Sequence, residues 1–226
     1  MKIEAIIFDM DGVIVDTEFF DFSIQKEFIR QENSFINLET TDFSELIGQS
    51  YNMLYETLKR FIGSTEPLEI IGDKFTKFSD EKYKSLNYKK LFRGDTLFLL
   101  EYAKEKQIKL AVASSSTYSH IVEVLSSCGI LSYFDVIYSG EFVEQSKPNP
   151  QVYLNVLEKL NIASEFCIAI EDSSYGITAA NEAGITTIAY QETRVPVYQD
   201  HAAYLAKNME HVQQIITELN ISDNVY

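Results

Sequence analysis

The sequence predicts an α/β protein built on a doubly wound, mainly parallel β-sheet, with a small helical domain inserted near its start. Two observations support this fold class. Apolar runs alternate with helical patterns over most of the 226 residues, as in a sheet covered by helices on both faces. Residues 16–87 lack a strand pattern and carry large apolar residues at helical spacing. We therefore expect a core of residues 1–15 and 88–226, and a helical insertion of residues 16–87, called the cap below.

The predicted strands are short runs of nearly continuous apolar residues. Because these runs do not alternate with polar residues, they indicate strands that are buried on both faces, as in a parallel sheet. Right-handed crossovers then place the carboxyl ends of the strands on one edge, where ligands bind. The clear runs are followed by one weaker run: Ala5–Phe8, Ile108–Ala113, Val136–Ser139, Phe166–Ile170, Thr186–Tyr190 and then Ala203–Ala206.

Helical patterns lie between the later runs. Apolar residues there recur every three or four positions, which is the spacing of one face of a helix. A strand, helix and strand in repetition predict the crossovers of a parallel sheet. The expected core helices are Asp95–Lys106, Tyr118–Cys128, Pro150–Leu160, Ser174–Ala183 and Met209–Leu219.

The cap is expected to consist of several helices that cover the carboxyl edge of the sheet. Its aromatic and aliphatic residues indicate a helical core rather than a cofactor site, because such stripes are usually buried between helices. Its ends, near Val15–Asp16 and Lys89–Arg93, would act as hinges. The residues that carry the pattern are Phe19, Phe22, Phe28, Leu46, Leu54, Leu58, Phe75 and Phe78.

Composition and charge narrow the functional class. The net charge of −15 and the lack of a basic stripe argue against nucleic acid as a partner. No apolar run is long enough to span a bilayer, and the start of the chain lacks a secretory signal, so we expect a cytoplasmic protein without a membrane partner. Cys128 and Cys167 are isolated and are expected to be buried thiols. We also expect a monomer.

The first candidate site is Asp9-Met10-Asp11-Gly12-Val13, which directly follows the strand Ala5–Phe8. Side chains alternate along an extended chain, so Asp9 and Asp11 can point into one crevice while Met10 points away. Two close carboxylates repel each other unless a cation or a substrate compensates their charge. An alternative is a simple turn, since Asp-Gly is a common turn sequence.

Three further segments follow predicted strands or open predicted helices. Ser114-Ser115-Ser116 supplies hydroxyl and amide donors, Lys147-Pro148-Asn149-Pro150 supplies a cation, and Glu171-Asp172-Ser173-Ser174 supplies a second acidic pair. Each has a simpler explanation as a helix-capping or solvated loop segment. Because a parallel sheet brings strand ends together, the four segments predict one site with oxygen ligands for a metal, a carboxylate nucleophile and donors for phosphoryl oxygens.

With these segments in this order and spacing, the chain resembles the haloacid dehalogenase superfamily of phosphohydrolases, in the branch of β-phosphoglucomutase and related sugar-phosphate phosphatases. The resemblance covers nearly the whole chain and extends to Ser173-Ser174-Tyr175-Gly176-Ile177. It implies a Rossmann-like core with a helical cap. It also implies a Mg²⁺-dependent phosphomonoester hydrolase that acts on a small phosphorylated metabolite, a sugar phosphate, through an aspartyl-phosphate intermediate.

The resemblance also implies a role for each matching residue. Asp9 would attack phosphorus, and Asp11 would act as general acid and then general base. Mg²⁺ would be bound by Asp9, by the backbone carbonyl of Asp11 and by Glu171 or Asp172. The phosphoryl oxygens would be held by Ser114, Lys147 and the amides after Asp9, with Gly12 and Ser115 beside the substrate.

The cap residues bear on the choice between phosphatase and mutase. In β-phosphoglucomutase, the resemblance leads us to expect a histidine where this chain has Asp21, and an arginine where Gly48-Gln49-Ser50-Tyr51 has Tyr51. A mutase must hold a second phosphate, which suits a guanidinium group and not a tyrosine. Hydrolysis is therefore favoured, with Asp21, Gln49 and Tyr51 as candidate substrate contacts. A mutase and a noncatalytic binding protein with the same fold remain the alternatives.

Overall fold

The core is a six-stranded parallel sheet, described from a computed structural model of residues 2–47, 49, 51–84 and 86–222. The strand order is β3-β2-β1-β4-β5-β6, and every neighbouring pair is parallel. This arrangement confirms the predicted fold class. The strands are β1 (Ala5–Phe8), β2 (Lys109–Ser114), β3 (Val136–Ser139), β4 (Cys167–Glu171), β5 (Thr186–Tyr190) and β6 (Tyr204–Ala206).

Two strands extend one residue further than their apolar runs indicated. Ser114 pairs with Ser139 of β3, and Glu171 pairs with Ala189 of β5, so both polar residues belong to the sheet rather than to the following loops. The sequence pattern ended each strand at its last apolar residue, whereas the ladder continues wherever a neighbouring strand still offers backbone partners. Consequently, both side chains are held rigidly at the carboxyl edge.

Helices cover both faces of the sheet. On one face α5 (Asp95–Lys106), α6 (Tyr118–Ser127) and α9 (Met209–Ser222) pack on side chains such as Ile6 and Phe8. On the other face α7 (Gln151–Leu160) and α8 (Ser174–Glu182) pack on the alternate residues, including Ala5 and Ile7. The small strand residues on the second face allow α7 and α8 to approach closely. The predicted core helices are present, with ends that differ by up to three residues.

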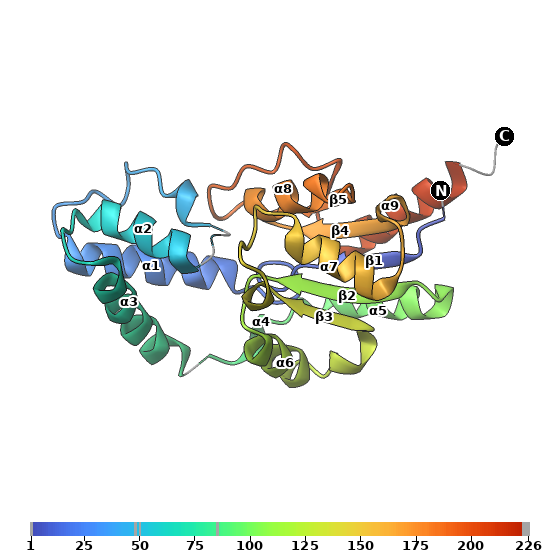
Figure 1. Cartoon of the computed structure of the whole chain (residues 1–226), viewed down its shortest axis with the longest axis horizontal. Coiled ribbons are helices and arrows are strands. Elements are labelled where there is room, and N and C mark those ends of the chain that lie inside the picture. Colours follow the sequence, from blue (N-terminus) through green and yellow to red (C-terminus); the bar gives the residue numbers. More distant parts are fainter. Residues whose placement is uncertain (1, 48, 50, 85, 223–226) are drawn as a thin grey trace.

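The inserted segment forms a second hydrophobic cluster. It contains α1 (Glu18–Glu32), α2 (Tyr51–Ile62) and α3 (Leu68–Tyr83), which lie together at one end of the molecule (Figure 1), and the short helix η1 (Ser44–Leu46). The short helix α4 (Tyr88–Leu91) follows the segment and packs against the core. As expected for a helical core, most of the predicted stripe is buried. Phe78 is partly buried against the cluster, and Phe19 has 44% of its surface exposed. The buried members are Phe22, Phe28, Leu46, Leu54, Leu58 and Phe75.

The chain enters and leaves this helical segment at adjacent points. Val15 forms a bridge with Phe92, and the Asp16 amide donates to the Leu91 carbonyl at 2.8 Å. Arg194, from the loop after β5, donates to both carboxylate oxygens of Asp16. The next residue, Val195, is buried in the hydrophobic cluster of the inserted helices. The loop after β5 therefore joins the core to the base of the inserted segment.

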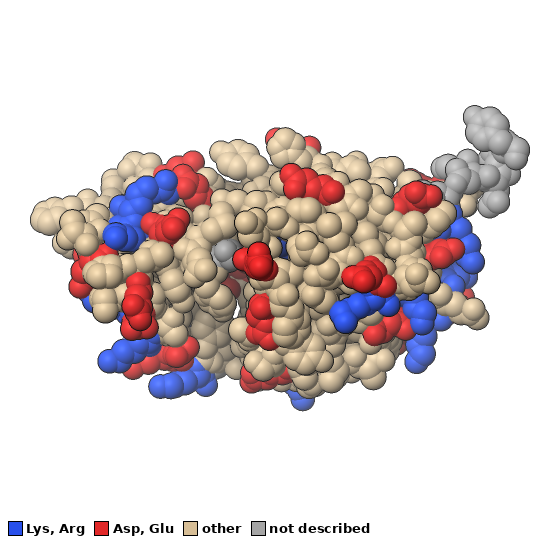
Figure 2. Space-filling view, in the orientation of Figure 1, with Lys and Arg blue, Asp and Glu red and all other residues tan. Residues whose placement is uncertain are grey.

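Charged side chains are distributed without a basic patch on the face shown in Figure 2, where Lys and Arg lie among acidic residues. Among the described residues, no helix has both the length and the apolar character needed to cross a membrane.

Candidate active site

The four predicted segments meet at the carboxyl edge of the sheet, beside the inserted helices. A pocket with a volume of about 140 Å³ lies there, between the core and the inserted helices. Its wall combines core residues with residues of α1, α2 and α3. The predicted site residues among its lining are Asp9, Asp11, Asp21, Gln49, Tyr51, Ser114, Ser115, Lys147 and Asp172.

A buried lysine links two of the carboxylates. Lys147 is 3% exposed, and its Nζ donates to Asp9 Oδ1 at 2.7 Å, to Glu171 Oε1 at 2.6 Å and to the carbonyl of Ala113 at 2.9 Å. These three bonds use all the donors of the ammonium group. The two carboxylates raise the pKa of Lys147 despite its burial, so the side chain stays charged.

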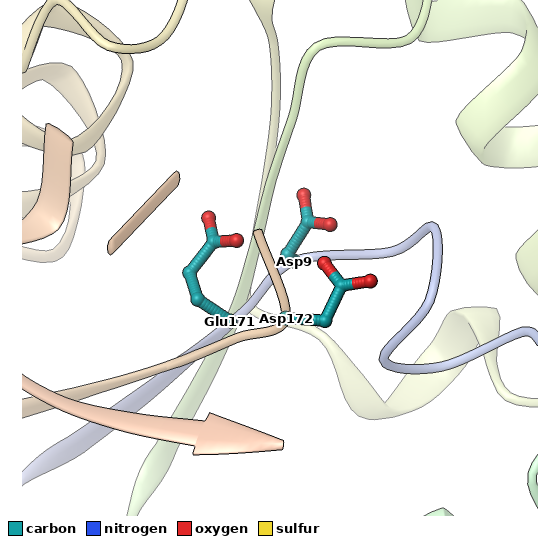
Figure 3. A group of neighbouring side chains, drawn as sticks. All are labelled: Asp9, Glu171 and Asp172. Atoms are coloured by element: carbon teal, nitrogen blue, oxygen red, sulfur yellow. The ribbon is translucent and has the colours of Figure 1, made fainter. Parts of the chain in front are cut away.

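Three carboxylates from the ends of β1 and β4 converge on one point (Figure 3). Asp9, Glu171 and Asp172 each place an oxygen within 4.8 Å of the others, and all three are buried. Glu171 lies behind the pocket lining, where Tyr153 also donates to its Oε1. Its other oxygen, Oε2, is buried without a hydrogen-bond partner among the described residues. An unpartnered carboxylate oxygen in such a group fits a bound cation.

Two glycines make room for these carboxylates. A Cβ on Gly12 would lie 1.8 Å from Asp172 Oδ2, and a Cβ on Gly176 would lie 2.0 Å from Glu171 Oε2. Gly12 also has a φ of +80°, which disfavours any side chain. Its amide donates to the Val15 carbonyl at 2.8 Å, and it is not part of the pocket lining. Gly12 thus supports the site by admitting the Asp172 carboxylate, and contact with a substrate stays a prediction.

Burial and mutual repulsion raise the pKa values of Asp9 and Asp172. The pKa of Asp9 is raised to about 8 because burial, with the charges of Glu171 and Asp11, outweighs the effect of Lys147. The pKa of Asp172 is also raised, first by burial and then by Glu18, Asp9 and Glu171. A single ammonium therefore does not balance these carboxylates, and the site has a deficit of positive charge that a metal cation can supply.

Asp11 is held by hydroxyl groups from two directions. Thr17 Oγ1 donates to its Oδ1 at 2.7 Å, and Ser116 Oγ donates to its Oδ2 at 2.8 Å. The Asp11 carboxylate is outside the group formed by Asp9, Glu171 and Asp172. Sequence reasoning predicted a metal contact through the Asp11 backbone only, so this separation leaves its carboxyl available for proton transfer. The sequence reasoning did not identify Thr17 or Ser116 as hydrogen-bond partners of Asp11.

The serine segment forms a second wall of the pocket. Ser114 is 1% exposed, and its Oγ accepts a hydrogen bond from the Ser116 amide at 3.1 Å. Ser115 Oγ accepts from Ser146 Oγ at 3.1 Å, which connects the loop after β2 to the segment that carries Lys147. Both serines line the pocket together with the acidic residues, and their hydroxyl groups can donate to an anionic ligand.

The wall contributed by the inserted segment combines acidic and polar side chains with apolar ones. Tyr83 donates to Asp21 Oδ1, and burial raises the pKa of Asp21 to about 7. Gln49 donates to Tyr175 Oη at 3.5 Å across to α8. Tyr51 lines the pocket but is 56% exposed. Gly48 and Ser50, which belong to the predicted substrate loop, lie outside the described residues.

Several pocket residues were missed by the sequence reasoning. Gln25 and Tyr83 line the pocket from α1 and α3, and Glu18 lies at its junction with the core. Helical periodicity from Asp21 was the available signal, because positions 18 and 25 share its face of α1. Phe19 and Phe20, which precede Asp21 on α1, do not line the pocket. Phe20 instead packs edge-on against Tyr83.

The sequence of the chain also matches those of known proteins. The family model for haloacid dehalogenase-like hydrolases matches residues 6–190. The chain is 34% identical over 199 residues to the phosphorylated carbohydrates phosphatase of Thermotoga maritima, covering 82% of this chain and 83% of the relative. It is 26% identical to a β-phosphoglucomutase of Bacillus subtilis, with 82% of each chain covered.

The fold of the chain also matches a solved structure. CbbY from Rhodobacter sphaeroides, a mutant in complex with xylulose-(1,5)bisphosphate, superposes with a TM-score of 0.70 at 25% identity, covering 91% of this chain and 94% of that one. The resemblance predicted from the motifs is thus confirmed, and the predicted enzyme class agrees with that of the phosphatase relatives. The chain belongs to the haloacid dehalogenase-like hydrolase family.

Proposed function

We propose that this chain is a Mg²⁺-dependent phosphomonoester hydrolase that acts on a small sugar phosphate through an aspartyl-phosphate intermediate. The buried cluster of Asp9, Lys147, Glu171 and Asp172 is the observation that carries the proposal, because it joins a carboxylate to a cation and to a candidate metal site. The match to a phosphatase of phosphorylated carbohydrates supports the substrate class. Residues 16–87 would form the cap that selects the substrate.

Asp9 is the proposed nucleophile. Lys147 holds its Oδ1, so Oδ2 is the oxygen that would attack phosphorus and form a P–O bond while the bond to the leaving oxygen breaks. Asp11 would protonate that leaving oxygen and later accept a proton from the water that hydrolyses the acyl phosphate. The hydrogen bonds from Thr17 and Ser116 fix the Asp11 carboxyl for both transfers.

The charge of the phosphoryl group requires compensation during this transfer. Lys147, Ser114 and Ser115 would donate to the phosphoryl oxygens or fix the groups around them. Asp9, Asp172 and Glu171 would hold Mg²⁺, together with the backbone carbonyl of Asp11, and the ion would supply the positive charge that the carboxylates and the phosphoryl group need.

We expect the increase in Tm caused by Mg²⁺ to depend on pH. The pKa of Asp9 is about 8 in the folded metal-free chain and 3.8 as an ordinary side chain, so the folded state holds a proton that the unfolded state releases. That stabilisation is present at low pH and is lost as pH rises through about 8. Mg²⁺ competes with protons for the same oxygens. Calorimetry should therefore show a larger increase in Tm with Mg²⁺ near pH 8 than near pH 6.

The control for this measurement is K⁺ at matched ionic strength, which should not reproduce the Mg²⁺ effect because it only screens charge. An equal increase in Tm at both pH values would contradict binding through Asp9 and Asp172, since proton competition would then be missing.

Hydrolysis is proposed over phosphoglucomutase activity because of the charges in the pocket. Among the described lining residues, Lys147 is the only Lys or Arg, and it is already bonded to Asp9 and Glu171. Tyr51 and Asp21 provide no cation for a second phosphate. A mutase needs such a group to retain its bisphosphate intermediate.

Incubation with β-glucose 1-phosphate and a trace of glucose 1,6-bisphosphate separates the two activities. We expect release of inorganic phosphate with no accumulation of glucose 6-phosphate, because water, not a bound sugar phosphate, would accept the phosphoryl group from Asp9. Phosphate can be followed with a colorimetric assay and glucose 6-phosphate with a coupled dehydrogenase. Accumulation of glucose 6-phosphate would instead support the mutase.

A further inference from the structure

A polar stripe runs along the pocket face of α1. Glu18, Asp21 and Gln25 are spaced at i, i+3 and i+7, so they share one side of the helix, and all three line the pocket. The helix rises about 1.5 Å per residue, so the stripe extends about 10 Å away from the metal-side carboxylates. Glu18 is at the near end, where its charge acts on Asp172, and Gln25 is at the far end.

The far part of this stripe contains buried acceptors without partners. Gln25 is 8% exposed, and its Oε1 has no hydrogen-bond partner among the described residues. Gln49, which also lines the pocket, has a buried Oε1 that likewise has no hydrogen-bond partner among the described residues. Asp21 adds a carboxylate that Tyr83 holds through Oδ1 only. Unpaired buried acceptors are costly unless a ligand donates to them, and hydroxyl groups are suitable donors.

Charge limits which ligand can lie there. The ionisable residues of α1 that line the pocket are Glu18 and Asp21, and the only described Lys or Arg in the lining is Lys147, at the base of the site. A second phosphate or a carboxylate beside Asp21 would therefore meet negative charge with no cation to compensate it. The apolar neighbours Ile24, Leu54 and Phe75 would reduce screening by water.

We infer that Asp21, Gln25 and Gln49 select an uncharged polyhydroxylated leaving group, whose hydroxyls donate to these side chains while its phosphate lies at Asp9 and Lys147. This inference rests on the proposed function and deepens it. The length of the stripe fits a polyol or sugar chain of about five or six carbons. Phosphorylated sugar acids and sugar bisphosphates are rejected by the acidic face of α1.

Three substrates test this selection in the unmodified enzyme. Sorbitol 6-phosphate has the hydroxyls, hexyl phosphate lacks them, and 6-phosphogluconate replaces the terminal alcohol of sorbitol 6-phosphate with a carboxylate. We expect kcat/KM to fall by about two orders of magnitude or more for hexyl phosphate, because the acceptors then remain unpaired. For 6-phosphogluconate we expect a decrease of about tenfold or more at pH 8, where Asp21, with a pKa of about 7, is mainly ionised and repels the carboxylate.

Two variants connect this selectivity to named side chains. Gln25→Leu should reduce the preference for sorbitol 6-phosphate over hexyl phosphate by about tenfold, and Asp21→Asn should narrow the difference between sorbitol 6-phosphate and 6-phosphogluconate. Matched controls are Gln31→Leu, at an exposed position of α1, and Asp73→Asn, at an exposed position of α3. In the controls, the ratios of kcat/KM for sorbitol 6-phosphate to kcat/KM for hexyl phosphate and for 6-phosphogluconate should stay unchanged.

Turnover of an aryl phosphate distinguishes failure of this inference from failure of the proposed function. Mg²⁺-dependent turnover of the aryl ester with equal kcat/KM for the three test substrates would overturn the inference and leave the proposed function intact. Selectivity that survives Gln25→Leu and Asp21→Asn in folded protein would also overturn it. No turnover of any ester, the aryl phosphate included, would remove the proposed function itself.

Discussion

Replacing Asp9 with Asn is expected to reduce Mg²⁺-dependent hydrolysis of an aryl phosphate by about four orders of magnitude or more. The amide oxygen is a poor nucleophile, so the acyl phosphate would not form, and loss of the nucleophile removes the contribution of the whole catalytic unit. The substitution keeps the size of a side chain that is 7% exposed, so the fold should persist. Release of the aryl alcohol, followed by absorbance with and without EDTA, measures the effect.

Asp73→Asn is the matched control, because it makes the same chemical change at an exposed position of α3. It should retain wild-type rates. If Asp9→Asn kept substantial activity, the attacking group would have to be another residue or a water molecule, and the covalent mechanism would be wrong. If the wild type also lacked Mg²⁺-dependent turnover, the alternative of a noncatalytic binding protein would gain support.

The core of the site could be predicted because its residues are fixed by the ends of strands. A parallel sheet places every carboxyl end on one edge, so Asp9, Ser114 and Asp172 meet although more than fifty residues separate each from the next. The sequence pattern missed only how far the strands extend. Glu171 pairs within the sheet, which buries it behind Lys147 rather than in the open pocket.

The partners of these residues could not be predicted in the same way. Tyr153 reaches Glu171 from α7, and Thr17 reaches Asp11 from the entry to the inserted helices. Each contact depends on how a helix packs on the sheet, and no local pattern in the sequence specifies that packing. Gln25 shares the face of α1 that carries Asp21, but helical spacing alone does not show that this face lines the pocket.

Replacing Lys147 with Met is expected to lower both stability and activity. The ammonium lies between Asp9 and Glu171, and its loss leaves two buried carboxylates without their cation. Removing one partner of a buried ion pair costs about 3–5 kcal/mol, and we expect a decrease of that size in the free energy of unfolding, measured by denaturant titration in EDTA. Because Lys147 also orients the proposed nucleophile Asp9 and supplies positive charge beside it, its loss should lower kcat by about two orders of magnitude.

Lys109→Met provides the comparison, because Lys109 forms an ion pair with Asp135 at 2.7 Å but is 57% exposed. An exposed pair contributes about 0–1 kcal/mol, so this variant should unfold close to the wild type. Mg²⁺ should restore part of the stability lost in Lys147→Met, since the ion can neutralise the same carboxylates, and should have no larger effect on Lys109→Met than on the wild type. Equal stability of the two variants in EDTA would show that Asp9 and Glu171 do not depend on the ammonium, and the charge balance on which the site is built would have to be reassigned.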